Sequence, residues 1–172
     1  MSARALGFSR GCSRGRAQLA WALESYPGAR VVDGTTETTT LPGGSVDVIT
    51  CAQALNWFDI GAFRAECMRI GGGSPLVVAL YNYKRGEARG SRYDMSTAVL
   101  YRVPAVREFD SPVYFNRESW HLYHASMAGV PQPSDSGYAA YAAGLDAEFD
   151  RGSADDVLRL DLVTRVYSER LG

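Results

Sequence analysis

The stretch SVDVITCAQALNWFD, residues 45–59, decides how the rest of the chain is organised. Its first half, residues 46–52, is a short and nearly continuous apolar run with β-branched residues. Such a run predicts a buried strand that is covered on both faces, as in the middle of a parallel sheet. In open α/β sheets, ligands bind outside the carboxyl ends of the strands, so the residues that follow are the first candidates for a site. These polar and aromatic residues are Gln53, Asn56, Trp57 and Asp59.

The composition indicates a single domain with enough chain to bury a hydrophobic core. The chain has 172 residues, of which 46% are hydrophobic, and a formal net charge of -1. This near-neutral balance gives no electrostatic reason to expect nucleic acid or an anionic membrane as a partner. Every apolar run is far shorter than the ~20 residues that a membrane-spanning helix needs. We therefore expect no nucleic-acid partner and no membrane association.

The three cysteines, Cys12, Cys51 and Cys67, lie far apart and include no CxxC spacing, and the chain has only two histidines. This spacing supports neither a disulfide framework nor a zinc site, so we expect no bound metal. Reduced cysteines in a cytoplasmic protein are the simpler interpretation.

The first twenty residues differ in composition from the rest of the chain. They contain four arginines among Ser, Gly and Ala, and the first acidic residue is Glu24. An Arg-rich and Ser-rich start without acids is typical of an organelle transit peptide, but a disordered tail is the interpretation that we favour. We accordingly divide the chain into a basic leader, residues 1–20, and a domain, residues 21–172.

Apolar periodicity and turn residues predict helices and strands along that domain. The first elements are a helix over 16–26, strands over 29–34 and 45–52, a helix over 60–70 capped by Asp59, and a strand over 75–81. This order is typical of a parallel sheet covered by helices. Further along we expect helices over 93–101, 117–127 and 137–149, an extended piece over 110–115, and an alternating strand over 157–167.

Four segments carry a resemblance to a known family. They are DGTTE at 33–37 with the Leu-Pro pair at 41–42, SVDVI at 45–49, ALNWFD at 54–59, and LDLVTRVY at 160–167. Together they resemble the class I S-adenosylmethionine-dependent methyltransferases, in the small-molecule, type 11-like branch whose fourth strand ends in an HWF-type turn. The resemblance implies an α/β, Rossmann-like sheet that is mostly parallel with an antiparallel C-terminal strand.

The resemblance also implies a cofactor, S-adenosylmethionine, and a set of residues that bind it. Thr35 and Thr36 would lie beside the adenine, through backbone amides or hydroxyls, and Glu37 belongs to the same loop. Many relatives carry an acid at the position of Thr35. Ala52 and Gln53, at the end of the strand, would line the cofactor trough.

The acceptor is expected to be a small organic molecule that lies beside Asn56 and Trp57. Tyr81, Asn82 and Tyr83, which follow the next apolar strand, are further candidates for the acceptor wall. In this branch the position of Asn56 is more often His, so Asn56 is expected to orient the acceptor rather than to take its proton. The attacking atom is not a protein residue, and no catalytic residue is assigned.

One departure from the family pattern concerns the glycine-rich GxGxG loop, which binds the methionine part and the ribose. Gly7, Gly11 and Gly15 follow no predicted strand, and the acidic residue expected after the second strand is also missing upstream of residue 29. We therefore expect a partial methyltransferase domain that is incomplete at its N-terminal side. Its exposed sheet edge at Val31 and Val32 would favour self-association.

Three functions follow from these observations. The first is methyl transfer from S-adenosylmethionine to a small organic acceptor. The second is a truncated or diverged methyltransferase-like domain without activity, which acts as an interaction module. The third, a nicotinamide-dependent oxidoreductase, ranks last because it needs the same glycine-rich loop and a Tyr-x-x-x-Lys pair that the chain lacks.

Overall fold

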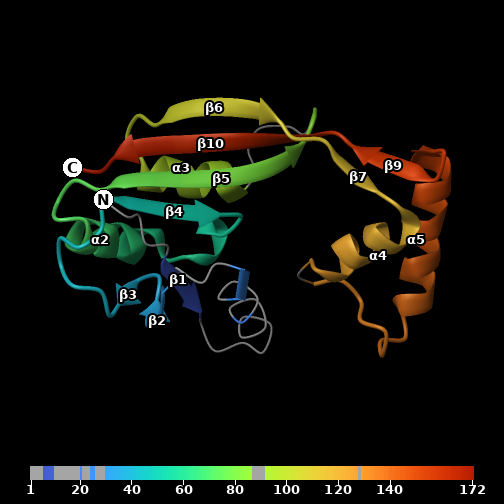
Figure 1. The fold of residues 1–172 in the computed structure, drawn as a ribbon, viewed down its shortest axis with the longest axis horizontal. Helices are drawn as coiled ribbons and strands as arrows, with labels where there is room; N and C mark the ends of the chain where they lie inside the picture. The colour runs from blue at the N-terminus through green and yellow to red at the C-terminus, as the bar shows by residue number, and fades with distance from the viewer. Residues whose placement is uncertain (1–5, 10–19, 21–23, 26–29, 87–91, 128) are drawn as a thin grey trace. The chain divides into compact units, whose positions relative to one another are not determined.

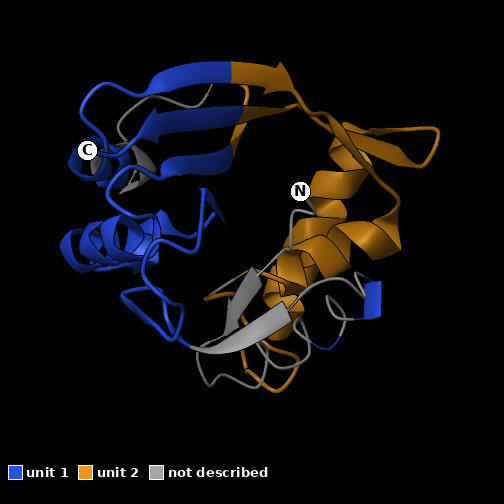
Figure 2. Cartoon of the chain, turned by 60° about the vertical axis from the view of Figure 1, so that its left-hand side comes forward, with its two compact units in different colours: residues 1–81, 88–107, 165–172 blue, residues 82–87, 108–164 orange. Residues whose placement is uncertain are grey.

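A computed structural model describes residues 6–9, 20, 24–25, 30–86, 92–127 and 129–172 of the chain (Figure 1). The helix predicted over 16–26 therefore lies largely outside the described residues. The chain forms two compact units (Figure 2). Unit 1 comprises Met1–Tyr81, Ala88–Arg107 and Arg165–Gly172, and unit 2 comprises Asn82–Glu87 and Glu108–Thr164.

The largest sheet has the strand order β4-β5-β10-β6. Its strands are β4 (Val48–Ala52), β5 (Leu76–Lys84), β10 (Leu162–Arg170) and β6 (Ala105–Asp110). β4 and β5 are parallel, in a register that runs from Val48 opposite Leu76 to Ala52 opposite Leu80. β10 runs in the opposite direction to both of its neighbours in Figure 1, which confirms an antiparallel C-terminal strand. Because β10 lies between β5 and β6, the sheet is mixed and not mostly parallel as expected.

β4 is the strand predicted by the opening stretch, but its surroundings differ from the prediction. Ile49 and Cys51 are half-buried, whereas Val48, Thr50 and Ala52 are exposed. One face is thus exposed, and β4 is the edge strand of its sheet among the described residues, so the expected two covered faces and the expected place in the middle of the sheet are both wrong. An apolar run shows that both faces tolerate burial, but it does not show how many neighbours are present to cover them.

Helix α2 (Ile60–Ile70) confirms the predicted helix after the strand. The side chain of Asp59 accepts a hydrogen bond from the amide of Ala62 at 3.0 Å, as expected for an N-cap. The buried side chains of α2 are at the predicted helical spacing and include Phe63, Cys67 and Ile70. The helix ends at Gly71, where an added Cβ would lie 2.3 Å from the Pro75 ring, so only glycine fits.

A second sheet in unit 1 has the order β1-β2-β3. Its strands are β1 (Leu6–Ser9), β2 (Arg30–Thr35) and β3 (Thr38–Thr39). β2 confirms the strand predicted at this place, and β2 and β3 form an antiparallel hairpin.

β1 is a strand inside the segment for which the composition predicted disorder. It pairs in parallel with β2, so that Gly7 lies opposite Val31 and Phe8 opposite Val32. This pairing covers one edge of β2 that we expected to be bare, while self-association itself stays a prediction. A strand also precedes Gly11 and Gly15, contrary to the sequence analysis, and these two glycines lie outside the described residues.

Unit 2 contains a small antiparallel sheet and two helices. The sheet has the order β7-β9-β8, with β7 (Val113–Phe115), β9 (Val157–Leu160) and β8 (Ser153–Ala154). The helices are α4 (Arg117–Ala125) and α5 (Tyr138–Gly152), both at predicted places. Asn116 and Ser119 form a capping box at the start of α4. The core consists of Phe115, Trp120, Leu145, Phe149 and Leu158.

The remaining elements refine the sequence analysis. α3 (Arg92–Leu100) confirms the predicted helix over 93–101. The alternating strand expected over 157–167 is two strands, β9 and β10, which are separated at Asp161. Within the described parts of the chain, no helix is both long enough and apolar enough to cross a membrane.

Candidate functional site

The loop that follows β4, residues 53–58, combines a strained backbone with an exposed aromatic side chain. Gln53 has a φ of 53°, which is a left-handed conformation that a non-glycine residue rarely adopts. Its amide donates a hydrogen bond to the carbonyl oxygen of Leu80 at 3.0 Å, so the strained residue is fixed to β5. The loop then forms a short 3-10 helix, η1 (Leu55–Trp57), in which Leu55 is fully buried and Trp57 is 68% exposed.

Asn56 adds a second unusual feature to this loop. Its Oδ1 atom is buried and has no hydrogen-bond partner among the described residues. A buried polar atom without a partner costs about 1–3 kcal/mol, so it calls for an explanation. Backbone strain, an unpaired buried oxygen and an exposed indole within five residues are features that cluster at ligand sites.

The hairpin turn between β2 and β3 is attached to the far end of the same loop. The amide of Asp59 donates a hydrogen bond to Oε1 of Glu37 at 3.3 Å. Burial opposes the ionisation of Glu37, but hydrogen bonds from its own amide, from Thr35 and Thr36, and from Asp59 outweigh it and lower the pKa of Glu37. The turn that carries Thr35, Thr36 and Glu37 therefore lies next to the loop, as the resemblance implied.

A buried acid, Glu66, holds the hairpin to α2 and was missed by the sequence analysis. It accepts hydrogen bonds from the Thr39 amide at 2.8 Å and from Nε and Nη2 of Arg69 at 2.7 Å each. The Arg69 hydrogen bonds, against the effect of burial, lower the pKa of Glu66 to about 2. Arg69 Nη2 also donates to the carbonyl oxygen of Leu41 at 2.9 Å. The only signal in the sequence was the i, i+3 spacing of Glu66 and Arg69.

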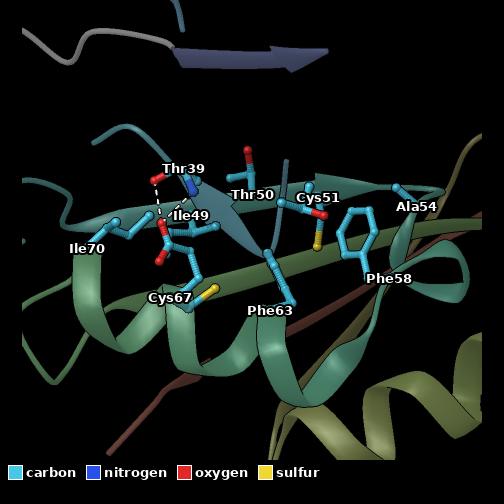
Figure 3. Close-up of a pocket in the computed structure, with 11 residues that line it drawn as sticks. Thr39, Ile49, Thr50, Cys51, Ala54, Phe58, Phe63, Cys67 and Ile70 are labelled. Carbon is cyan, nitrogen blue, oxygen red and sulfur yellow. Dashed lines mark hydrogen bonds between the residues drawn. The ribbon is translucent and has the colours of Figure 1, made fainter. Parts of the chain in front are cut away.

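A cavity of about 250 Å³ lies among the hairpin, β4, the loop and α2 (Figure 3). Its apolar lining includes Ile49, Phe58 and Phe63, and Thr36 and Thr50 add hydroxyl groups. A cavity with mostly apolar walls and a few polar groups is the usual form of a small-molecule site.

The two cysteines of this cavity have raised pKa values. Burial raises the pKa of Cys51 to about 12. It is also the main reason why the pKa of Cys67 is raised to about 12. Both are free thiols. Cys67 is buried and Cys51 half-buried, and both pack as small hydrophobic side chains.

Of the five predicted cofactor residues, Thr36 alone is part of the cavity lining. Cys51 and Ala54 line it, whereas Ala52 and Gln53 do not. Side chains alternate between the two faces of a strand, so Cys51 and Ala52 face opposite sides of β4. The sequence therefore located the end of the strand correctly but did not determine which side chains face the cavity.

The predicted acceptor residues of β5 do not share one face. Tyr81 is 1% exposed and makes an edge contact with the Tyr167 ring at 6.2 Å, so it belongs to the core of unit 1. Asn82 lies on the opposite face of the strand, where its Oδ1 accepts a hydrogen bond from Thr164 at 2.8 Å. Tyr83 is half-buried on the face of Tyr81.

The two histidines lie on α4 and each contacts a residue of α5. His121 Nε2 lies 3.0 Å from Asp146 Oδ1, and His124 Nδ1 lies 3.0 Å from the Tyr141 hydroxyl. In the part of the chain that the structure describes, no three His, Cys, Asp or Glu side chains form a group that could hold a metal ion.

The arrangement of the elements is similar to that of several solved structures over nearly the whole chain. A candidate type II methyltransferase from Anaeromyxobacter dehalogenans matches 97% of this chain and 89% of its own length, with a TM-score of 0.54 and 20% identity. A candidate methyltransferase from Bacillus halodurans matches 98% of this chain and 83% of its own, with a TM-score of 0.56 and 12% identity. The chain has the fold of the class I S-adenosylmethionine-dependent methyltransferases.

The YcgJ protein from Bacillus subtilis matches this methyltransferase fold as well. The match covers 97% of this chain and 82% of that protein, with a TM-score of 0.53 and 14% identity. No protein-family model and no curated protein sequence matches the chain. At these identities the similarity concerns the fold, and the activity is a separate question.

Proposed function

We propose that the chain transfers a methyl group from S-adenosylmethionine to a small organic acceptor. The observation that carries this proposal is the loop 53–58, which follows a parallel strand of a methyltransferase fold at its carboxyl end. Ligands of open α/β sheets bind at such ends. The strain at Gln53 and the unpaired Oδ1 of Asn56 are both in this loop, where a ligand would account for them.

The residues around the cavity fit the adenine half of the cofactor. Thr36 and Ala54 belong to its lining, and Phe58 adds an aromatic wall suited to a flat heteroaromatic ring. Thr35 and Thr36 would bind the adenine, and Gln53, at the end of β4, would lie beside the rest of the cofactor, whereas Ala52 faces the other side of the strand. When bound, S-adenosylmethionine supplies an electrophilic methyl group.

On the acceptor side, we assign Asn56 and Trp57, which belong to unit 1. The exposed indole of Trp57 offers a flat apolar surface, and the amide of Asn56 can orient a polar group. Tyr81 is buried in the core, so we do not assign it to the acceptor wall. The attacking atom belongs to the acceptor, so the chain contributes positioning and the exclusion of water.

A second candidate function is a diverged domain without activity that acts as an interaction module. It is favoured by the exposed edge strand β4, whose residues Val48, Thr50 and Ala52 are uncharged. An uncharged edge strand of high β-propensity readily pairs with another chain. Under this alternative, we expect concentration-dependent self-association in sedimentation velocity.

The free thiols of Cys51 and Cys67 suit a reducing compartment, and we place the protein in the cytoplasm under either function.

The test is titration calorimetry of the full chain with S-adenosylhomocysteine, using homocysteine as the control ligand. We expect saturable heat with S-adenosylhomocysteine and none with homocysteine, because the fitted residues lie on the adenine side. A chain that melts cooperatively and yet gives no heat at millimolar ligand would refute the methyltransferase proposal.

A further inference from the structure

The loop 53–58 is held at both of its ends by hydrogen bonds to other elements. At its start, the Gln53 amide donates to the Leu80 carbonyl oxygen of β5 at 3.0 Å. At its far end, the Asp59 amide donates to Oε1 of Glu37 at 3.3 Å. A strained conformation such as that of Gln53 persists only when its surroundings fix it. The bond to Leu80 holds Gln53 directly, and the bond to Glu37 holds the far end of the loop.

Asp59 makes the second attachment effective because it has two roles. Its amide binds Glu37, while its side chain caps α2 by accepting from the Ala62 amide at 3.0 Å. One residue therefore joins the hairpin turn, the end of the loop and the first turn of α2. A displacement of the turn would move all three together.

The carboxylate of Glu37 is directed at protein groups. Besides Asp59, the Thr35 and Thr36 side chains and its own amide supply hydrogen bonds that favour the ionised form. Thr35 also accepts from the Thr38 amide at 3.1 Å, so the turn is closed on itself. These contacts join the carboxylate to the turn itself and to the backbone at the start of α2.

We propose that Glu37 is a positioning residue, which fixes the turn 35–37 and the loop 53–58 as one unit and does not contact the cofactor. The inference rests on the proposed function for its effect on binding. It changes the assignment of Glu37, which the resemblance had placed among the cofactor-binding residues.

Glu66 holds the same hairpin at its other side and has a different role. It is buried, and it fixes Thr39 of β3 to α2, as the dashed lines at Thr39 in Figure 3 mark. Its loss is expected to destabilise unit 1 as a whole. Glu37 is only half-buried, so its substitution should leave the fold intact and reveal the positioning effect.

The experiment compares E37A and E37Q with the wild type, and with E148Q as a matched control at an exposed glutamate of unit 2. Amide hydrogen exchange by NMR reports the attachment at Asp59, and calorimetry reports the affinity for S-adenosylhomocysteine. For E37A we expect Asp59 exchange to accelerate about tenfold, with affinity about tenfold weaker, as for a lost hydrogen bond to a charged group. E37Q keeps an acceptor oxygen, so both quantities should stay within about threefold of the wild type. E148Q should change neither.

Two results would overturn the proposal. One is unchanged Asp59 exchange in E37A, because the attachment would then be absent in solution. The other is an E37Q variant that keeps Asp59 protection but binds S-adenosylhomocysteine as weakly as E37A, because the charge would then contact the ligand. If the wild type itself binds no S-adenosylhomocysteine, the proposed function fails, while the exchange data still decide whether Glu37 fixes the loop.

Discussion

The core of unit 2 and the loop after β4 in unit 1 each contain a tryptophan, and the two residues are in opposite environments. Trp120 is 1% exposed, and its Nε1 donates to the Leu145 carbonyl oxygen at 3.2 Å. Its ring lies 5.4 Å from the Phe115 ring in an edge-on contact. Trp57 is 68% exposed and directly follows Asn56, whose buried oxygen has no partner among the described residues.

The difference lies in how well the local interactions are satisfied. In unit 2 the aromatic rings are packed and the indole nitrogen is satisfied, so the local interactions agree with one another. The loop 53–58 instead retains strain, an unpaired oxygen and a cavity, each of which lowers stability. Proteins tolerate such features where a ligand needs them, and the substitutions below test this interpretation.

The largest expected effect is that of W120A. Truncation removes a fully buried indole and leaves a large cavity among Phe115, Leu145 and Phe149, which should destabilise unit 2 by about 3–5 kcal/mol. Urea unfolding followed by circular dichroism measures the loss. W57A is the matched control, because an exposed indole contributes below about 1 kcal/mol to the free energy of unfolding. The W57A variant should nevertheless bind the acceptor more weakly. Similar losses for both variants would refute the comparison.

The next effect concerns Glu66, which fixes the hairpin beside the candidate site. E66A removes hydrogen bonds from Thr39 and Arg69 to a buried carboxylate, and it should cost about 2–3 kcal/mol in unfolding free energy. The pKa of Glu66 is lowered from 4.5 to about 2. Its contribution to the free energy of unfolding is therefore complete above pH 4.5 and is lost as the pH falls towards 2. Urea midpoints at pH 7, 4 and 2.5 should therefore fall more steeply for the wild type than for E66A. Parallel curves would contradict this assignment.

Local patterns predicted the elements around the site, but not the contacts that complete it. The strand before Gln53, the cap at Asp59 and the end of α2 at Gly71 follow from short-range chemistry, and the structure confirms them. β1 was missed because LGFS is only four residues long and lies in an Arg-rich segment, and its pairing with β2 is a tertiary contact. The same limit applies to β4, whose apolar run did not reveal that one of its faces is exposed.

The candidate site was predictable to a similar extent. The position of the loop 53–58 and its proximity to the turn 35–37 followed from the resemblance and from the ends of the strands. Whether Cys51 or Ala52 faces the cavity depends on which residues of β4 point to each face of the sheet. The burial of Tyr81 in the core depends on the elements that pack against β5. A single sequence did not contain that information.

A smaller effect is expected from the pH dependence of unit 2. His124 packs edge-on against the Trp120 ring at 4.3 Å, and its Nε2 is buried without a partner among the described residues. Burial is the main cause that lowers its pKa below 6.5; Glu148 opposes the shift, while Lys84 and His121 add to it.

The sign of this effect follows from the lowered pKa of His124. The unfolded chain binds the proton first as the pH falls below 6.5, so stability decreases from there down to the folded-state pKa. Urea midpoints at pH 7.5 and 5.5 should show this decrease in the wild type and a smaller one in H124F, which keeps a ring beside Trp120. An NMR titration of His124 with a midpoint at or above 6.5 would contradict the prediction.

The smallest expected effect concerns two places with a left-handed backbone. One is a hairpin turn that requires this geometry, and the other is Gln53, where we attribute it to a ligand. Asp155 and Asp156 of unit 2 have φ values of 50° and 59°, between the paired strands β8 and β9. A two-residue hairpin turn needs this geometry, so D156G should raise the unfolding free energy by up to about 1 kcal/mol without any effect on ligands. Gln53, with a φ of 53°, lies in no such turn. Q53G should give a similar gain in urea unfolding, but it should also weaken S-adenosylhomocysteine binding, because the released loop loses its fixed conformation. If Q53G gained stability and bound as well as the wild type, the strain at Gln53 would be a property of the fold alone, as it is at Asp156.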